Sequence, residues 1–141
     1  MVVLDTDHLS LLERPASGPG ERLRQRILSI GADQFTTTII TFDEQTRGWL
    51  SFAGQARTVG EQVEAYKRLR KHLDNYRALV VLDFDQEAAW QLQRLQKLRL
   101  RIGTMDLKIA AIVLVHDATL LSRNLQHFGQ VPGLKVEDWS G

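Results

Sequence analysis

Short apolar runs alternate along this chain with longer segments in which apolar residues recur at helical spacing. The short runs predict buried strands at residues 2–5, 35–40, 78–84 and 119–122, with 135–136 as a short fifth strand. Because short strands that alternate with helices are typical of parallel sheets, the pattern predicts an α/β fold. Its sheet is expected to be mostly parallel and covered by helices on both faces.

The segments between these strands predict helices. One begins near Asp7 and stops before Pro15, and others cover 21–30, start around Thr41, span 57–75, include 88–98 and cover 107–115. Apolar residues mark the helix at 57–75 as amphipathic; they are Val59, Val63, Tyr66, Leu69 and Leu73. Residues 107–115 are apolar on every face, so we expect this helix to be buried on several sides. The Pro/Gly cluster at 15–20 is interpreted as a loop.

Length and composition limit the classes of protein that the chain can represent. Its 141 residues, 43% hydrophobic and 25% charged, predict one globular domain spanning 1–141. The absence of cysteine excludes disulfides, thiolate zinc sites and cysteine nucleophiles, so any metal must be held by oxygen or imidazole. With no basic leader segment and no apolar run of membrane-spanning length, we expect a cytoplasmic protein without a membrane partner.

Polar residues follow the predicted strands at the edge where open α/β sheets carry their active sites. They are Asp5 and Asp7 after the first strand, Asp43 and Glu44 after the second, Asp106 before the fourth and Asn124 after it. Several carboxylates at one edge repel one another unless a cation neutralises them. Oxygen ligands without cysteine suit Mg²⁺ or Mn²⁺, so the pattern favours a metal site.

Each of these carboxylates also has a purely structural interpretation. Asp7 is a suitable N-cap for the helix that follows it, and Thr41 with Glu44 fits the S/T-x-x-E capping box. Asp106 in a first helical turn is favoured by the helix dipole. Neighbours on a helix are turned about 100° apart, so only one of Asp43 and Glu44 can face the cleft.

Four motifs together resemble PIN-domain ribonucleases, and their order resembles the VapC-type toxins of type II toxin–antitoxin modules. The motifs are Val3-Leu4-Asp5-Thr6-Asp7; Ile40-Thr41-Phe42-Asp43-Glu44 followed by Gly48; Ile102-Gly103-Thr104-Met105-Asp106-Leu107-Lys108-Ile109-Ala110-Ala111; and Thr119-Leu120-Leu121-Ser122-Arg123-Asn124 followed by Phe128, Val131-Pro132-Gly133-Leu134 and Glu137-Asp138-Trp139. The resemblance covers nearly the whole chain. It implies a PIN-like three-layer α/β/α sandwich with a mostly parallel sheet of four or five strands.

The resemblance also implies an activity and the residues that carry it. It implies a Mg²⁺-dependent endoribonuclease, with Mn²⁺ as a substitute, that cuts structured RNA such as tRNA or rRNA by metal-activated water. Asp5 and Asp106 are implied as metal ligands, and Glu44, selected over Asp43 by the position of Gly48, as a ligand or as the residue that orients the attacking water. The implied partners are a VapB-type antitoxin, whose C-terminal segment blocks the active site, and a second copy in a homodimer.

The fourth catalytic position departs from the pattern of many relatives. It is occupied by Asn124, where they carry Asp. An amide still hydrogen-bonds a metal-bound water but contributes no charge, which leaves open whether one or two metals bind. The interpretation of Asp7 also stays open.

Basic residues are unevenly distributed although the net charge is only +1. The acid-free residues 88–105 run into the Asp106 motif, and we expect Arg99, Arg101 and Arg123 to contact RNA. The helix at 57–75 mixes acids and bases, which fits an ion-paired, solvated face equally well. The histidines His8, His72, His116 and His127 show no ligand spacing, and Trp49, Phe52 and Trp90 are interpreted as core or dimer-interface residues.

Two other functions compete with the ribonuclease interpretation. A phosphatase of the haloacid-dehalogenase type also places D-x-D after an apolar strand and would use Asp5 as nucleophile, but the chain lacks its later acidic pair. A non-catalytic binding module would leave the carboxylates as helix caps.

Overall fold

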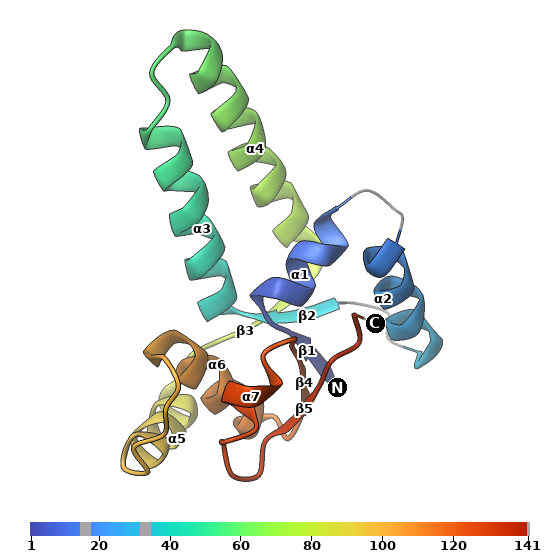
Figure 1. The fold of residues 1–141 in the computed structure, drawn as a ribbon, viewed down its shortest axis with the longest axis vertical. Coiled ribbons are helices and arrows are strands. Elements are labelled where there is room, and N and C mark those ends of the chain that lie inside the picture. The colour runs from blue at the N-terminus through green and yellow to red at the C-terminus, as the bar shows by residue number, and fades with distance from the viewer. Residues whose placement is uncertain (15–17, 32–34, 141) are drawn as a thin grey trace.

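Five strands, all paired in parallel, form the centre of the computed structural model, which describes residues 1–14, 18–31 and 35–140 (Figure 1). One ladder has the order β1-β4-β5, and β2 pairs with β3 in a second ladder. The strands are β1 (Val2–Leu4), β2 (Phe35–Thr38), β3 (Leu79–Leu82), β4 (Thr119–Leu121) and β5 (Lys135–Glu137). The registers pair Leu4 with Leu121 and Leu121 with Glu137, so these three strands end at one edge.

A buried threonine side chain joins the two ladders. The Thr37 hydroxyl in β2 donates a hydrogen bond of 2.8 Å to the main-chain carbonyl of Leu4 in β1. The polar group of a threonine-rich strand is thereby satisfied without water. The five strands consequently act as one layer in the order β3-β2-β1-β4-β5, and the ends of β1 and β2 lie together.

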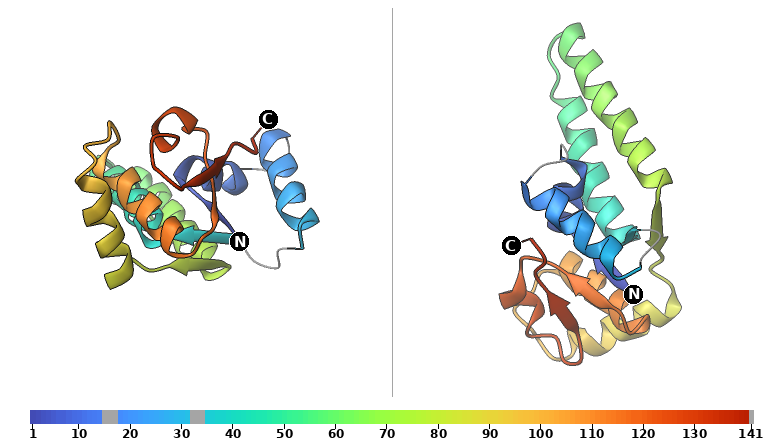
Figure 2. Two further views of the ribbon diagram at one scale, coloured as in Figure 1. Left: turned by 90° about the horizontal axis from the view of Figure 1, so that it is seen from below. Right: turned by 90° about the vertical axis from the view of Figure 1, so that its right-hand side faces the viewer.

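Helices cover both faces of this layer, as the alternating pattern predicts. The helices are α1 (Thr6–Glu13), α2 (Gly18–Ser29), α3 (Ile39–Gly54), α4 (Val59–Arg77), α5 (Gln86–Gln96), α6 (Thr104–Val115) and α7 (Leu125–Phe128). Viewed from below, α1 and α2 lie on one side of the strands, and α5 and α6 lie on the other (Figure 2). The arrangement is the predicted three-layer α/β/α sandwich.

Alternate strand residues supply the two hydrophobic cores of the sandwich. Val3 and Leu120 pack in the core with α5 and α6, whereas their neighbours Leu4 and Leu121 pack in the core with α1 and α2. Successive side chains of a strand point to opposite faces, so continuous apolar runs bury both faces of the layer. Helix α6 is buried on several sides as predicted. In the described ranges no helix is long and apolar enough to cross a membrane.

Helices α3 and α4 form a hairpin that projects away from the sandwich (Figure 1). Most of the apolar stripe of α4 is exposed: Val59, Val63, Tyr66 and Leu73 have exposed fractions of 76%, 51%, 62% and 49%. Helical spacing correctly predicts this amphipathic helix. Of the two interpretations of Phe52 and Trp90, core or dimer interface, the core one is wrong, because they are 42% and 61% exposed.

The helix caps differ from those predicted. Asp5, not Asp7, caps α1 by accepting a hydrogen bond of 3.2 Å from the His8 amide. Thr38 caps α3 by accepting one from the Thr41 amide, so residues 39–40, predicted to extend the strand, already belong to the helix. The interpretation of Thr41 and Glu44 as a capping box is therefore wrong, and the Glu44 side chain is available for another contact.

The boundary of α2 also differs from its prediction. Gly18–Gly20, predicted as loop, form the first turn of this helix, while residues 15–17 lie outside the described part of the chain. A Cβ on Gly20 would lie 2.4 Å from the Leu11 carbonyl oxygen. Glycine is required here because α1 and α2 approach too closely for any side chain, a tertiary demand that local propensity does not reveal.

Candidate functional site

The predicted polar residues converge at the carboxyl edge of the strands. Asp5 ends β1 and caps α1, Asp7 lies in the first turn of α1, and Asn124 follows β4. Asp106 lies in the first turn of α6, which begins beside this edge. The charge of Asp106 raises the pKa of Glu44 on α3, and the charge of Asp7 raises the pKa of Asp106, so these carboxylates lie within electrostatic reach of one another. The structure thus brings together residues from four separate segments of the chain.

Asp5 is the most deeply buried carboxyl group of this edge, with an exposed fraction of 6%. Burial, together with a hydrogen bond to Asp7 and the charge of Asp7, raises the pKa of Asp5 to about 8, although a hydrogen bond with Ser122 opposes the shift. The folded chain therefore favours a protonated Asp5 hydrogen-bonded to an ionised Asp7. A cation at this point would replace that proton and relieve the repulsion.

Glu44 and its neighbour Asp43 point in different directions, as the helical geometry predicts. The Thr6 hydroxyl donates a hydrogen bond of 3.1 Å to Glu44 Oε1, whereas Asp43 accepts one of 2.6 Å from Arg47 Nε on the outer face of α3. Burial and then the charges of Asp106 and Asp43 raise the pKa of Glu44. Thr6 holds Glu44 toward the site. Both residues belong to the sequence motifs, but the motifs do not show that they are in contact.

Asp106 and Asn124 form the opposite side of the site. Burial raises the pKa of Asp106, and the charge of Asp7 adds to it, while the charge of His127 and a hydrogen bond from Asn124 oppose it. The Asn124 side-chain nitrogen also lies 2.9 Å from His127 Nδ1, and the backbone N–H of Asn124 donates to Ser122 Oγ at 2.9 Å. Asn124 therefore links Asp106 to α7 without adding charge.

His8 is a residue of this site that the sequence analysis missed. Asp5, Asp7 and His8 bring ligand-type atoms within 4.8 Å of one another. The His8 ring is fully buried, with Nδ1 2.8 Å from Asp7 Oδ1 and Nε2 3.1 Å from the Trp139 amide nitrogen. The sequence does contain one indication of this role, because His8 directly follows Asp5-Thr6-Asp7 at a strand end. The histidines show no metal-ligand spacing, so this indication is missed when spacing alone is considered.

The arginines expected to contact RNA occupy two places. Arg123 borders the site: its amide donates to Asp7 Oδ2 at 3.3 Å, and its Nε donates to Ser140 Oγ at 3.1 Å. Arg99 and Arg101 are exposed in the connection between α5 and α6, where the Arg101 amide donates to the Gln130 side chain. The structure therefore brings Arg123 to the carboxylates through its backbone.

The donor set of the site fits a hard divalent cation. Asp5, Glu44 and Asp106 all have raised pKa values because they are buried near other carboxylates. Oxygen donors in this number are the ligands that Mg²⁺ and Mn²⁺ prefer. A carboxylate cluster of this kind destabilises the fold unless protons or a cation occupy it.

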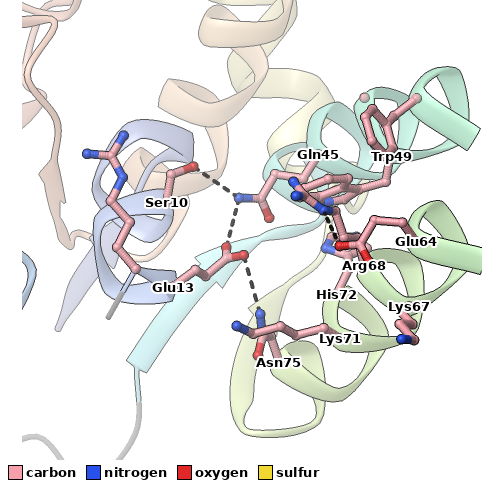
Figure 3. Close-up of a pocket in the computed structure, with 13 residues that line it drawn as sticks. Ser10, Glu13, Gln45, Trp49, Glu64, Lys67, Arg68, Lys71, His72 and Asn75 are labelled. Carbon is pink, nitrogen blue, oxygen red and sulfur yellow. Dashed lines mark hydrogen bonds and ion pairs between the residues drawn. The ribbon is translucent and has the colours of Figure 1, made fainter. Parts of the chain in front are cut away.

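A groove of about 970 Å³ lies beside the site, between α1 and the α3–α4 hairpin (Figure 3). Its side toward α1 is tied together by hydrogen bonds, because Glu13 accepts from the amides of Gln45 at 3.0 Å and Asn75 at 3.3 Å. Basic side chains outnumber acids in its lining: Arg14, Lys67, Arg68 and Lys71 against Glu13 and Glu64. Ser10 and Gln45 meet at the groove, and Thr6 and Glu44 meet at the site, so the same two helices form both. The carboxylates Asp5, Glu44 and Asp106 themselves do not line the groove.

Comparison with known proteins identifies the family. The model of the PIN domain matches residues 2–134. Similar solved structures include VapBC-1 from nontypeable Haemophilus influenzae, with 20% identity, full coverage of both chains and a TM-score of 0.77. VapBC2 from Rickettsia felis bound to a promoter DNA fragment has 19% identity, 99% coverage of both chains and a TM-score of 0.73.

FitAcB from Neisseria gonorrhoeae is similar to the same extent, with 20% identity over 99% of this chain and 98% of that one and a TM-score of 0.68. Among proteins of curated function, no sequence matches significantly. The structural likeness extends over the whole length, so it concerns the complete fold and not a shared motif. By its match to the family model, the chain belongs to the PIN domain family, which is a family of nucleases.

Proposed function

We propose that the protein is a VapC-type toxin, an endoribonuclease that depends on Mg²⁺ or Mn²⁺ and cleaves structured RNA such as tRNA or rRNA. The observation that carries this proposal is the convergence of Asp5, Glu44 and Asp106 at the carboxyl edge of a PIN fold. Similar structures were solved as VapBC and FitAB complexes, which supports the toxin class. The family assignment favours a nuclease over the phosphatase and binding-module alternatives.

In this proposal each residue of the site has a distinct role. Asp5 and Asp106 hold the ion, and Glu44, fixed by Thr6, holds it or orients the attacking water. When bound, the ion lowers the pKa of water and stabilises negative charge on the phosphoryl group. Asn124 donates its hydrogen bond to Asp106 and holds that carboxylate in place. The neutral amide leaves the site with less negative charge than an aspartate would.

The RNA and protein partners are assigned to different surfaces. Arg99, Arg101 and Arg123 are proposed to contact the RNA backbone, with Arg123 directly beside the carboxylates. The antitoxin is a VapB-type protein whose C-terminal segment blocks the active site, and the basic groove beside α1 offers a surface for its acidic groups (Figure 3). The exposed apolar stripe of α4 supports a homodimer. We place the protein in the cytoplasm, where its RNA substrates are found.

The test compares two aspartate variants after brief expression in cells. Asp5→Asn removes a ligand charge but keeps the N-cap of α1, since asparagine caps helices equally well. Asp43→Asn is the matched control, because Asp43 is ion-paired to Arg47 on the outer face of the same helix as Glu44. We expect discrete new RNA ends with the wild type and Asp43→Asn and none with Asp5→Asn. A fully active Asp5→Asn variant would contradict the proposal.

A further inference from the structure

His8 lies between the carboxylate site and the C-terminal segment. Its ring is fully buried, and each nitrogen has one close partner. Nδ1 faces Asp7 Oδ1 at 2.8 Å, and Nε2 faces the backbone amide of Trp139 at 3.1 Å. The hydrogen bond with Trp139 joins residues 131 positions apart, so it connects α1 to the C-terminal end of the described chain.

The Trp139 amide determines which nitrogen of His8 carries the proton. A backbone N–H only donates, so Nε2 must accept with its lone pair and carries no hydrogen in this contact. The neutral ring then has its hydrogen on Nδ1, from which it donates to Asp7 Oδ1. Rotating the ring by 180° would place C–H groups against both partners and lose both bonds.

This arrangement excludes His8 as a metal ligand, although its ring lies within the Asp5–Asp7–His8 cluster. A histidine that binds a metal through Nδ1 donates from Nε2. Here Nε2 accepts a hydrogen bond instead. The carboxylate oxygen nearest to Nε2 is Asp138 Oδ1 at 3.5 Å, and this oxygen accepts hydrogen bonds from the backbone N–H of Ser140 at 2.8 Å and from its hydroxyl at 2.6 Å. The ring can therefore orient a ligand but not serve as one.

The Trp139 amide is itself held in a fixed position. The indole is 7% exposed and packs in the core between the strands and α2. The Arg26 guanidinium of α2 lies 4.3 Å from the indole ring centre. Segment 138–140 is thus docked through a large buried side chain, and its backbone amide reaches His8 as a consequence of that docking.

The Asp7 carboxylate accepts hydrogen bonds from His8 and from the Arg123 backbone. His8 Nδ1 binds Oδ1, and the Arg123 amide lies 3.4 Å from Oδ1 and 3.3 Å from Oδ2. These contacts fix the orientation of the Asp7 carboxylate, which also lies within hydrogen-bond reach of Asp5 and within electrostatic reach of Asp106.

We propose that His8 is a positioning residue that, with its tautomer set by the Trp139 amide, holds Asp7 as an additional carboxylate of the divalent-cation site. The inference rests on the proposed metal-dependent function and adds a residue to it that the motif does not assign. In the wild type, the docking of segment 138–140 thereby sets which nitrogen of His8 donates to Asp7.

Two substitutions of His8 separate its two hydrogen bonds. His8→Asn places an amide nitrogen where Nδ1 lies, so it keeps the donor to Asp7 but loses the acceptor for the Trp139 amide. His8→Gln places an oxygen where Nε2 lies, so it keeps the contact with Trp139 but loses the donor. Asp7→Asn and the double variant Asp7→Asn/His8→Gln complete a thermodynamic cycle.

The measurement is the affinity of each purified full-length variant for Mn²⁺ by isothermal titration calorimetry, beside its thermal midpoint without metal. We expect His8→Gln and Asp7→Asn each to weaken Mn²⁺ binding by about 10-fold or more, in the range seen when the partner of a metal ligand is removed. His8→Asn should stay within about 3-fold of the wild type, a smaller loss because the partner is kept. In the Asp7→Asn background, His8→Gln should have no further effect.

The outcomes distinguish this inference from the proposed function. Absence of Mn²⁺ binding by the wild type would overturn the metal-dependent function and the inference with it. If the wild type binds but affinity follows thermal stability in every variant, His8 is only a packing residue and the inference alone fails. Additive losses in the cycle would show that His8 acts independently of Asp7, as a direct ligand would, and would also overturn it.

Discussion

The carboxylate edge of the sandwich and the projecting α3–α4 hairpin differ in how their charged residues are buried and paired. At the edge, Asp5, Glu44 and Asp106 are buried beside other carboxylates, and their pKa values are raised. On the hairpin, acids and bases alternate at helical spacing and form exposed ion pairs such as Arg68 with Glu64 at 3.3 Å. The hairpin instead exposes its apolar residues. The edge therefore has uncompensated charge, and the hairpin has uncovered apolar surface.

This difference shows what each region requires from outside the chain. The packed body holds the carboxylates together despite their repulsion, and a divalent cation would relieve it. The hairpin has exposed ion pairs, so its charges do not require a cation. Its exposed apolar stripe is typical of a surface that contacts another protein. The carboxylate edge and the hairpin can therefore be perturbed separately, and the following predictions test that separation.

The largest contrast is expected from the same leucine truncation in the two regions. Leu121→Ala in the fully buried β4 should lower the free energy of unfolding by about 2–5 kcal/mol, because it removes contacts and leaves a cavity. Leu73→Ala on α4, where the side chain is 49% exposed in the single chain, should cost less than about 1 kcal/mol at protein concentrations too low for the proposed homodimer. Urea unfolding of both variants measures the difference. Equal losses that depend on protein concentration would mean that the hairpin is buried in a dimer.

The second prediction concerns the pH dependence of the metal-free protein. Because the pKa of Asp5 is raised from 3.8 to about 8 on folding, the folded state keeps a proton that the unfolded state releases above pH 4. The contribution of Asp5 to stability is thus greatest below its unfolded pKa and declines as the pH rises toward its folded pKa. Asp5→Asn should remove this decline and stabilise the metal-free protein at pH 8 by more than about 1 kcal/mol.

Thermal unfolding between pH 4 and pH 8 in the presence of a chelator checks this prediction. Adding Mn²⁺ at pH 8 should then raise the midpoint of the wild type and leave that of Asp5→Asn nearly unchanged, since only a bound ligand stabilises the native state. The stability gained by Asp5→Asn over the wild type should grow with pH over this range, and a gain that does not change with pH would contradict the raised pKa of Asp5.

These contrasts also mark what the sequence predicts and where it stops. Apolar periodicity predicts the strands and helices because burial on both faces of a parallel sheet needs continuous apolar runs, as in 78–84. The caps are missed because Asp5 and Asp7, or Thr38 and Thr41, are equally good capping residues, and only the tertiary path of the chain selects between them. The Gly20 contact is missed for the same reason.

The candidate site follows the same division. Strand-end position predicts that Asp5, one of Asp43 and Glu44, and Asp106 meet, because parallel strands share a carboxyl edge. The resemblance to PIN-domain ribonucleases selects Glu44. The contact of Thr6 with Glu44 joins residues 38 positions apart, and that of His8 with Trp139 joins opposite ends of the chain. Periodicity contains no information on such pairs, so they are found only in the folded structure.

A third prediction tests how firmly the hairpin is attached to the body. The Tyr76 hydroxyl at the base of α4 donates to Gln45 Oε1 on α3 at 2.7 Å, and Gln45 in turn donates to Glu13 on α1. Tyr76→Phe should cost about 1 kcal/mol, the usual net value of one hydrogen bond. Tyr66→Phe, on the exposed stripe of the same helix, is the matched control and should have no measurable effect on urea unfolding.

The smallest effect is expected from the ion pairs of the hairpin. Glu64→Gln removes the partner of Arg68 at a position where both side chains are more than half exposed. Water and salt already screen such pairs, so the change in the free energy of unfolding should stay below about 0.5 kcal/mol. A double-mutant cycle with Arg68→Gln isolates the pair, and its coupling should vanish in about 1 M salt, where the screening length is about 3 Å. A coupling that survives high salt would mean that a second protein surface shields the pair, and the hairpin would then be covered in solution.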